Sequence, residues 1–172
     1  MKQLITAHCA LITVLSMAMF LIACGDDDKG EESLEAEACR HAADGPVASL
    51  TAASLSEFQP PDATAEHTRI DLTLPSDDEA GFHGTIGYLA REHAHYQFYV
   101  SQDLDMVITH VSGQIMTPEA IEVVGRCTEL AVVYTVELLR GAYLVQLSSD
   151  EHEMVSLVVE NQGDTHAQGH TH

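Results

Sequence analysis

The chain has 172 residues and carries 27 acidic against 7 basic side chains, a formal net charge of −20. Such a composition excludes a nucleic-acid binder, because neutralising phosphates requires an excess of Lys and Arg. Hydrophobic residues make up 45% of the chain. That share is enough for a core, so a wholly disordered acidic protein is also excluded. The length suits one folded domain once a targeting segment is set aside.

Residues 1–23 are typical of a secretory signal peptide. Lys2 precedes an apolar run over residues 4–23, and an acidic stretch follows this run at once. Because no basic cluster follows that would stop translocation, the run is interpreted as a signal peptide. Its length leaves a membrane anchor open as the alternative.

The end of this run, Leu21-Ile22-Ala23-Cys24, resembles the lipobox of bacterial lipoproteins. The resemblance implies cleavage before Cys24, a diacylglycerol group on its thiol and acylation of the new amino terminus. Together these acyl chains give a stable anchor, so the membrane is an expected partner. Since Gly25 rather than Asp follows the cysteine, the resemblance favours the outer membrane of a Gram-negative envelope.

The expected organisation after the signal peptide has three parts. Residues 24–38 are predicted to form a lipid-anchored linker, because seven acidic side chains and few apolar ones make it solvated and self-repelling. A short helix over residues 33–38 is an option, since Ser33 can cap it. The folded domain is predicted over residues 39–160. Residues 161–172 are predicted to form a flexible tail that contains histidines.

The cysteines predict a disulfide bond. Cys9 leaves with the signal peptide and Cys24 carries the lipid, so two cysteines remain in an oxidising compartment. This even pair predicts a bond between Cys39 and Cys127. Use of the pair for metal or redox chemistry is the alternative, although the chain has no C-x-x-C motif.

From residue 39 onward the hydrophobic pattern has a period of two, which predicts an all-β domain. The expected strands are 70–74, 82–88, 94–100, 104–110, 132–138, 143–147 and 155–159, with 47–51 and 119–124 as further candidates. Turn residues about every ten positions favour a single antiparallel β-sandwich of about eight strands over a layout of alternating strands and helices.

Segments 134–138, 141–147 and 155–159 (YTVEL, GAYLVQL and VSLVV) resemble the closing strands of bacterial prepeptidase-C-terminal modules. This resemblance implies a jelly-roll or similar sandwich with an accessory, non-catalytic role. The pattern Cys39-x-His41-x-x-x-Gly45-Pro46 and the histidine-containing tail are similar to uncharacterised periplasmic lipoproteins, a resemblance that names no activity.

The sequence lacks the common catalytic templates. It has no Gly-x-Ser-x-Gly elbow, no glycine-rich phosphate loop before a helix and no His-Glu-x-x-His motif. Carboxylates are so frequent that no pair of them stands out for acid–base work. We therefore expect a protein that is not an enzyme, with a hydrolase built from distant residues as a remote alternative.

Histidine is the unusual chemical resource of this chain. His93 and His95 are expected on one face of a strand, where two imidazoles can share one ion. The tail offers three more donors, which are His166, His170 and His172. A polar strand face and a disordered tail with incidental histidines are the competing interpretations.

Further candidate ligands are His41, His67 and His83, and His83 is expected beside His93 and His95 if its strand pairs with theirs in antiparallel order. Neutral imidazole favours Zn²⁺, Cu²⁺ or Ni²⁺ over Ca²⁺, which prefers oxygen ligands. The sequence thus predicts an envelope lipoprotein that binds or buffers a transition metal, with zinc as the first choice. The alternative is a non-catalytic module that binds an envelope protein or a glycan.

Overall fold

The structure, a computed structural model, describes residues 33–54, 59–77 and 81–162. Cys24 and the tail histidines His166, His170 and His172 lie outside these ranges, as does the predicted signal peptide. No helix within the described ranges is long and apolar enough to cross a membrane.

The described chain begins with one α-helix, α1 (Leu34–Asp44). Ser33 caps it, because its hydroxyl oxygen accepts a hydrogen bond from the amide of Ala36 at 3.3 Å. The helix ends at Gly45, whose backbone N–H donates a hydrogen bond to the carbonyl oxygen of His41. A β-carbon at this position would lie 2.5 Å from that oxygen. The helix therefore runs across residues 38 and 39, where the sequence predicted the linker to meet the domain.

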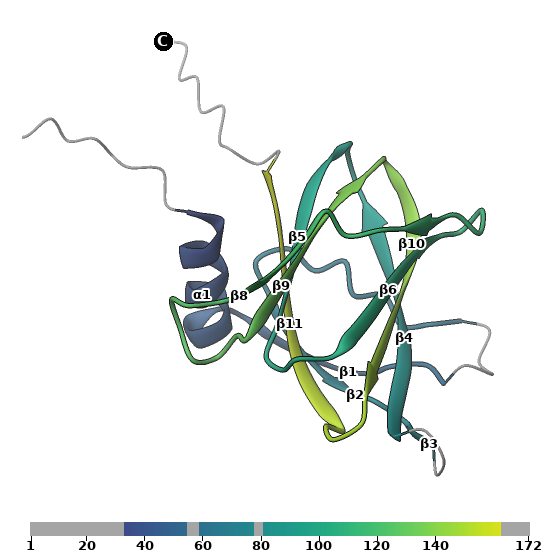
Figure 1. The fold of residues 1–172 in the computed structure, drawn as a ribbon, viewed down its shortest axis with the longest axis horizontal. Coiled ribbons are helices and arrows are strands. Elements are labelled where there is room, and N and C mark those ends of the chain that lie inside the picture. Colours follow the sequence, from purple (N-terminus) through teal and green to yellow (C-terminus); the bar gives the residue numbers. More distant parts are fainter. Residues whose placement is uncertain (1–32, 55–58, 78–80, 163–172) are drawn as a thin grey trace, which may run out of the picture. The chain divides into compact units, whose positions relative to one another are not determined.

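Eleven strands follow in the described chain, in two stacked sheets (Figure 1). The six-stranded sheet has the order β1 (Val47–Thr51), β2 (Arg69–Thr73), β11 (Met154–Asn161), β5 (Ala94–Val100), β9 (Val132–Leu138) and β8 (Ala120–Val123). The five-stranded sheet has the order β3 (Ser76–Asp77), β4 (Gly81–Ala90), β10 (Gly141–Ser149), β6 (Asp105–His110) and β7 (Ile115–Met116).

This architecture confirms the all-β sandwich. Each strand expected from the alternating pattern is present, and the surplus over about eight consists mainly of the two-residue strands β3 and β7. Neighbouring strands are antiparallel except β1 and β2, which pair in parallel. A parallel pair needs a crossover, and here the connection forms isolated bridges to β4 in the other sheet, Ala53 with Thr85 and Asp62 with Gly87, before it returns to β2.

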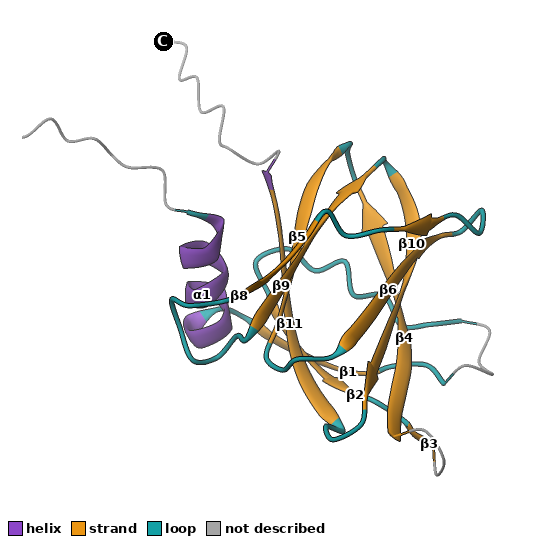
Figure 2. Ribbon diagram, viewed as in Figure 1, coloured by secondary structure: helices purple, strands orange, loops and turns teal. Residues whose placement is uncertain are grey.

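Strand alternation gives the six-stranded sheet two buried faces. On β11, Leu157 and Val159 point into the core between the sheets. Val158 belongs to a second apolar cluster, which lies on the opposite face of this sheet. That cluster combines Ala38, Cys39, Ala42, Tyr99, Val124, Leu130, Val133 and Val158. Helix α1 thus forms a third layer over the outer face of the sheet (Figure 2).

The predicted disulfide between Cys39 and Cys127 is present and ties this layer together. It joins α1 to the loop between β8 and β9, with a Cα–Cα distance of 5.8 Å and a sequence separation of 88 residues. Closing a loop of this length stabilises the folded chain by about 4–5 kcal/mol in the chain-entropy model.

Buried tyrosines make the fold sensitive to alkaline pH. Burial is the main cause that raises the pKa of Tyr88, Tyr99, Tyr134 and Tyr143 above the usual range. A raised pKa means that the fold favours the neutral phenol. The contribution of these tyrosines to stability should thus be fully present below about pH 10, the pKa of an unfolded tyrosine, and should be lost as the pH rises above it.

Urea unfolding at a series of alkaline pH values tests this expectation, with absorbance of the phenolate as a second measurement. In a Tyr88→Phe variant, we expect the free energy of unfolding to fall less steeply with alkaline pH, because the variant lacks one of the groups that ionise on unfolding. A free energy of unfolding that is flat through about pH 11 would contradict the raised pKa values.

Candidate metal centre

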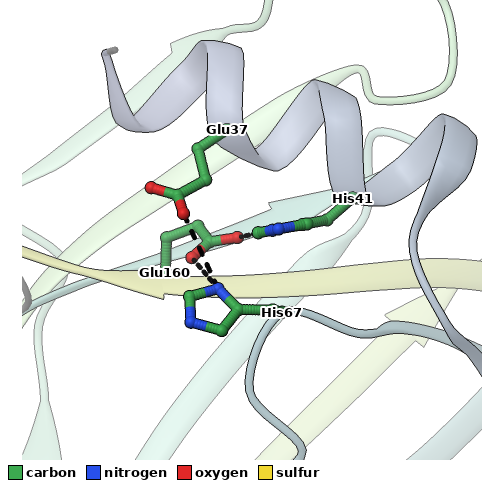
Figure 3. Close-up of side chains that lie close together, drawn as sticks. All are labelled: Glu37, His41, His67 and Glu160. Carbon is green, nitrogen blue, oxygen red and sulfur yellow. Dashed lines mark hydrogen bonds and ion pairs between the residues drawn. The ribbon is translucent and has the colours of Figure 1, made fainter. Parts of the chain in front are cut away.

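Four side chains from three separate segments converge between α1 and the outer face of the six-stranded sheet (Figure 3). Helix α1 supplies Glu37 and His41, the turn before β2 supplies His67, and β11 supplies Glu160. Each residue offers one ligand atom, and all of these atoms lie within 4.8 Å of one another. In the part of the chain that the structure describes, no other group of three or more His, Cys, Asp or Glu side chains meets this condition.

Helix geometry places the first two side chains. Glu37 and His41 are four residues apart, so they lie on the same face of α1, one turn from each other. Ala38 and Ala42 on the buried side of the helix are small and allow its backbone to approach the sheet. His41 is consequently almost fully buried, whereas the Glu37 carboxylate sits half-buried at the rim of the contact.

Glu160 is the buried carboxylate of the group. Alternation along β11 puts it on the same face as Val158, beneath α1, where its exposed fraction is only 4%. Burying a carboxylate is costly unless it is hydrogen-bonded. The Nδ1 atom of His41 lies 2.6 Å from its Oε1 atom and provides such a bond between the helix and the sheet.

His67 closes the group from the solvent side. Its Nδ1 atom lies 3.7 Å from Oε1 of Glu37 and 3.6 Å from Oε2 of Glu160, and 46% of its side chain is exposed. The ring centroids of His67 and His41 are 4.8 Å apart. Its backbone has a φ of 50°, in the left-handed region, which costs a residue with a β-carbon about 1 kcal/mol. Such local strain is found disproportionately at functional sites.

The separations around His67 suit an ion better than direct hydrogen bonds. Zinc–nitrogen and zinc–oxygen bonds of about 2.0–2.2 Å place the ligand atoms of a tetrahedral site ~3.4 Å apart. The distances of 3.6 and 3.7 Å exceed the usual range of a hydrogen bond but lie close to this spacing.

The contact between His41 and Glu160 is shorter than two ligands of one tetrahedral ion require. At 2.6 Å it is a hydrogen bond, which holds Oε1 of Glu160 while Oε2 faces His67. If the Nδ1 atom of His41 and the Oε1 atom of Glu160 moved apart by ~0.8 Å, His41 could also coordinate the metal ion. Without that movement, His41 orients the Glu160 carboxylate, as hydrogen-bonding partners of metal ligands commonly do.

A small cavity adjoins the solvent side of the group. His67 and Glu160 form part of its lining, together with Tyr88, Arg91 and Tyr96. Its volume is about 20 Å³, enough for one water molecule. The burial of His41 and Glu160 leaves the side of His67 and this cavity as the most open approach for an ion.

The surface pair predicted from the sequence has a different arrangement. His93 Nε2 lies 2.6 Å from Oε1 of Glu137, and His95 Nε2 lies 3.2 Å from Oε2 of Glu119. Each imidazole is thus half-exposed and occupied with its own carboxylate. His83 is not their cross-strand neighbour, because β4 belongs to the other sheet, where His83 lies opposite Ser148.

Two of the further histidine candidates, His41 and His67, are those that the fold brings together. The carboxylates Glu37 and Glu160 were not singled out by the sequence analysis. A signal for Glu37 existed in its spacing of four residues from His41, which becomes meaningful once the helix is known to reach Asp44. Glu160 has no comparable local signal, because the two histidines that face it are 93 and 119 residues distant in the chain.

Comparison with known proteins adds no family to this description. No protein-family model matches the chain, and no curated protein is significantly similar to it.

The two histidines should affect stability differently in metal-free protein. A His41→Ala variant loses the buried hydrogen bond to Glu160, so the free energy of unfolding should fall by about 1–3 kcal/mol. A His67→Gly variant relieves the left-handed backbone at a half-exposed position, so its stability should change by less than ~1 kcal/mol.

Urea unfolding in the presence of a chelator measures both variants. His67→Asn serves as the matched control, because asparagine also tolerates the left-handed region. A large loss of stability in His67→Gly would show that His67 has a mainly structural role.

Proposed function

We propose that this protein binds a divalent transition-metal ion, with Zn²⁺ as the best fit, between Glu37, His41, His67 and Glu160. The observation that carries the proposal is the convergence of two imidazoles and two carboxylates within 4.8 Å from three segments of the chain. Chance clusters of acidic groups are common on an acidic surface. This cluster differs because its central carboxylate is buried and two histidines face it.

The donor set argues for the class of metal. Zinc is commonly bound by histidine nitrogen together with carboxylate oxygen, whereas Ca²⁺ and Mg²⁺ prefer oxygen ligands alone. Two ionised carboxylates and two neutral imidazoles carry a formal charge of −2, which one divalent ion neutralises. Cu²⁺ and Ni²⁺ suit imidazole as well and are expected to compete.

The exposure of His67 supports an exchangeable ion rather than a permanently enclosed one. Capture or buffering of metal is the function that this arrangement supports best. From residue 39 onward the chain has five basic and twenty acidic residues, and the resulting negative field raises the local concentration of cations. His93 with His95, and the tail histidines, stay predictions of additional and weaker sites.

Titration calorimetry with Zn²⁺ tests the proposal on protein that lacks the predicted signal peptide. We expect saturable binding, and we expect His67→Asn to weaken it by about 100-fold or more, because a ligand is lost while the backbone conformation is kept. The control is the double variant His93→Asn with His95→Asn, which removes two accessible imidazoles elsewhere and should retain the strong site.

Two results would reject the centre. The first is the absence of saturable Zn²⁺ binding in the wild-type protein. The second is a pattern in which the double variant of His93 and His95 loses the strong site while His67→Asn keeps it. Capture of a defined envelope protein or glycan that is unaffected by chelator would instead favour the alternative interaction module.

We also propose that a lipid on Cys24 holds the protein at the envelope, on the basis of the lipobox resemblance. Expression in a Gram-negative host with a clickable fatty acid should label the wild-type protein and place it in the membrane fraction. Cys24→Ser should lose the label and leave that fraction, whereas Cys9→Ser, within the predicted signal peptide, should remain labelled. An unlabelled wild-type protein would contradict the anchor.

A further inference from the structure

Half of the proposed ligand set depends on an element that is weakly held by apolar contacts. Helix α1 carries Glu37 and His41, but its buried apolar side chains are only Ala38, Cys39 and Ala42. The helix has 11 residues, and isolated helices of about that length are marginal in water. Its position therefore depends on specific links to the rest of the domain.

The disulfide is the covalent link, and it lies within the ligand-bearing turn. Cys39 stands between Glu37 and His41 in the sequence, and its bond to Cys127 reaches the loop between β8 and β9. The same loop contacts the start of the helix, where the amides of Gly125 and Arg126 each donate to Oε1 of Glu35 at 3.0 Å. The bond thus fixes the helix to the sheet that carries Glu160.

We propose that the metal affinity of the centre is coupled to the Cys39–Cys127 disulfide, so that reduction weakens metal binding and bound metal makes the disulfide harder to reduce. This inference rests on the proposed metal-binding function. Reduction by a dithiol cleaves the Sγ–Sγ bond with two electrons and two protons and leaves two thiols. The dithiol supplies these two electrons and two protons, and it is itself oxidised to a cyclic disulfide.

Preorganisation is the physical basis of the coupling. With the disulfide intact, Glu37 and His41 are already positioned against His67 and Glu160, so binding does not have to order the helix. Without it, the helix is docked for only a fraction of the time, and the apparent dissociation constant rises by the inverse of that fraction. The sandwich itself should persist, because the core between the sheets contains no residue of α1.

The effect must be reciprocal, which gives a second, independent measurement. If the disulfide strengthens metal binding by some factor, bound metal stabilises the disulfide by the same factor. A tenfold change in the dissociation constant corresponds to 29.6 mV in the reduction potential of a two-electron couple. We expect a coupling of about tenfold, within the usual range for coupled sites.

The first experiment compares the dissociation constant for Zn²⁺ of the oxidised protein with that of the double variant Cys39→Ala with Cys127→Ser. This variant lacks both thiols, so free cysteines cannot bind the ion themselves. The expected result is binding weakened by about tenfold, while hydrogen exchange quickens in α1 and the strands stay protected. His67→Asn with the disulfide intact is the control for a lost ligand.

The second experiment measures the reduction potential in dithiol redox buffers, with free Zn²⁺ fixed by nitrilotriacetate or removed by chelator. Zinc should give the wild-type protein a lower potential, relative to its zinc-free value, than it gives His67→Asn. Zinc held by the two free thiols would affect both proteins alike, so the difference between them reports the coupling. Binding to the oxidised protein that His67→Asn does not weaken would defeat the metal centre itself. Binding at the centre with equal affinity in oxidised and disulfide-free protein would overturn only the coupling. Loss of strand protection on reduction would also overturn it.

Discussion

The contact between His41 and Glu160 is the interaction around which the outer layer of this protein is organised. A carboxylate that is only 4% exposed has to be compensated, and the compensating imidazole comes from a helix rather than from the sheet. The position of α1 is therefore tied to a polar requirement of β11 as well as to apolar packing. The helix brings Glu37 to the same carboxylate, and the turn before β2 brings His67 to it.

Much of the fold was accessible from the sequence because the strands of a sandwich have local signatures. The alternation of Tyr96, Phe98 and Val100 with more polar residues predicts which side chains face the core, and this prediction needs no long-range information. The disulfide followed from counting cysteines in an oxidising compartment. Two features were not accessible in this way, namely the length of the helix and the division of neighbouring strands between two sheets.

Those two features explain why the candidate centre differs from the sites expected beforehand. The acidic composition of residues 24–38 resembles that of a linker, but the helix starts inside this segment because Ser33 caps it and residues 38–42 pack on the sheet. Antiparallel pairing of the consecutive strands β4 and β5 would put His83 beside His93 and His95, but the two strands belong to different sheets. The meeting of His41, His67 and Glu160 depends on tertiary pairing, which sequence spacing does not encode.

The crossover between the parallel strands β1 and β2 has a consequence for the rim of the sandwich. The stretch of β4 beyond its short pairing with β3 would be a free sheet edge, and residues of the crossover bond to it at Thr85, Gly87 and Leu89. Free edges are templates for association between molecules. The described part of the crossover thus has two roles, because it covers the edge of β4 and its last turn brings His67 to the candidate centre. A change in this one connection would expose the sheet edge and displace a candidate ligand together.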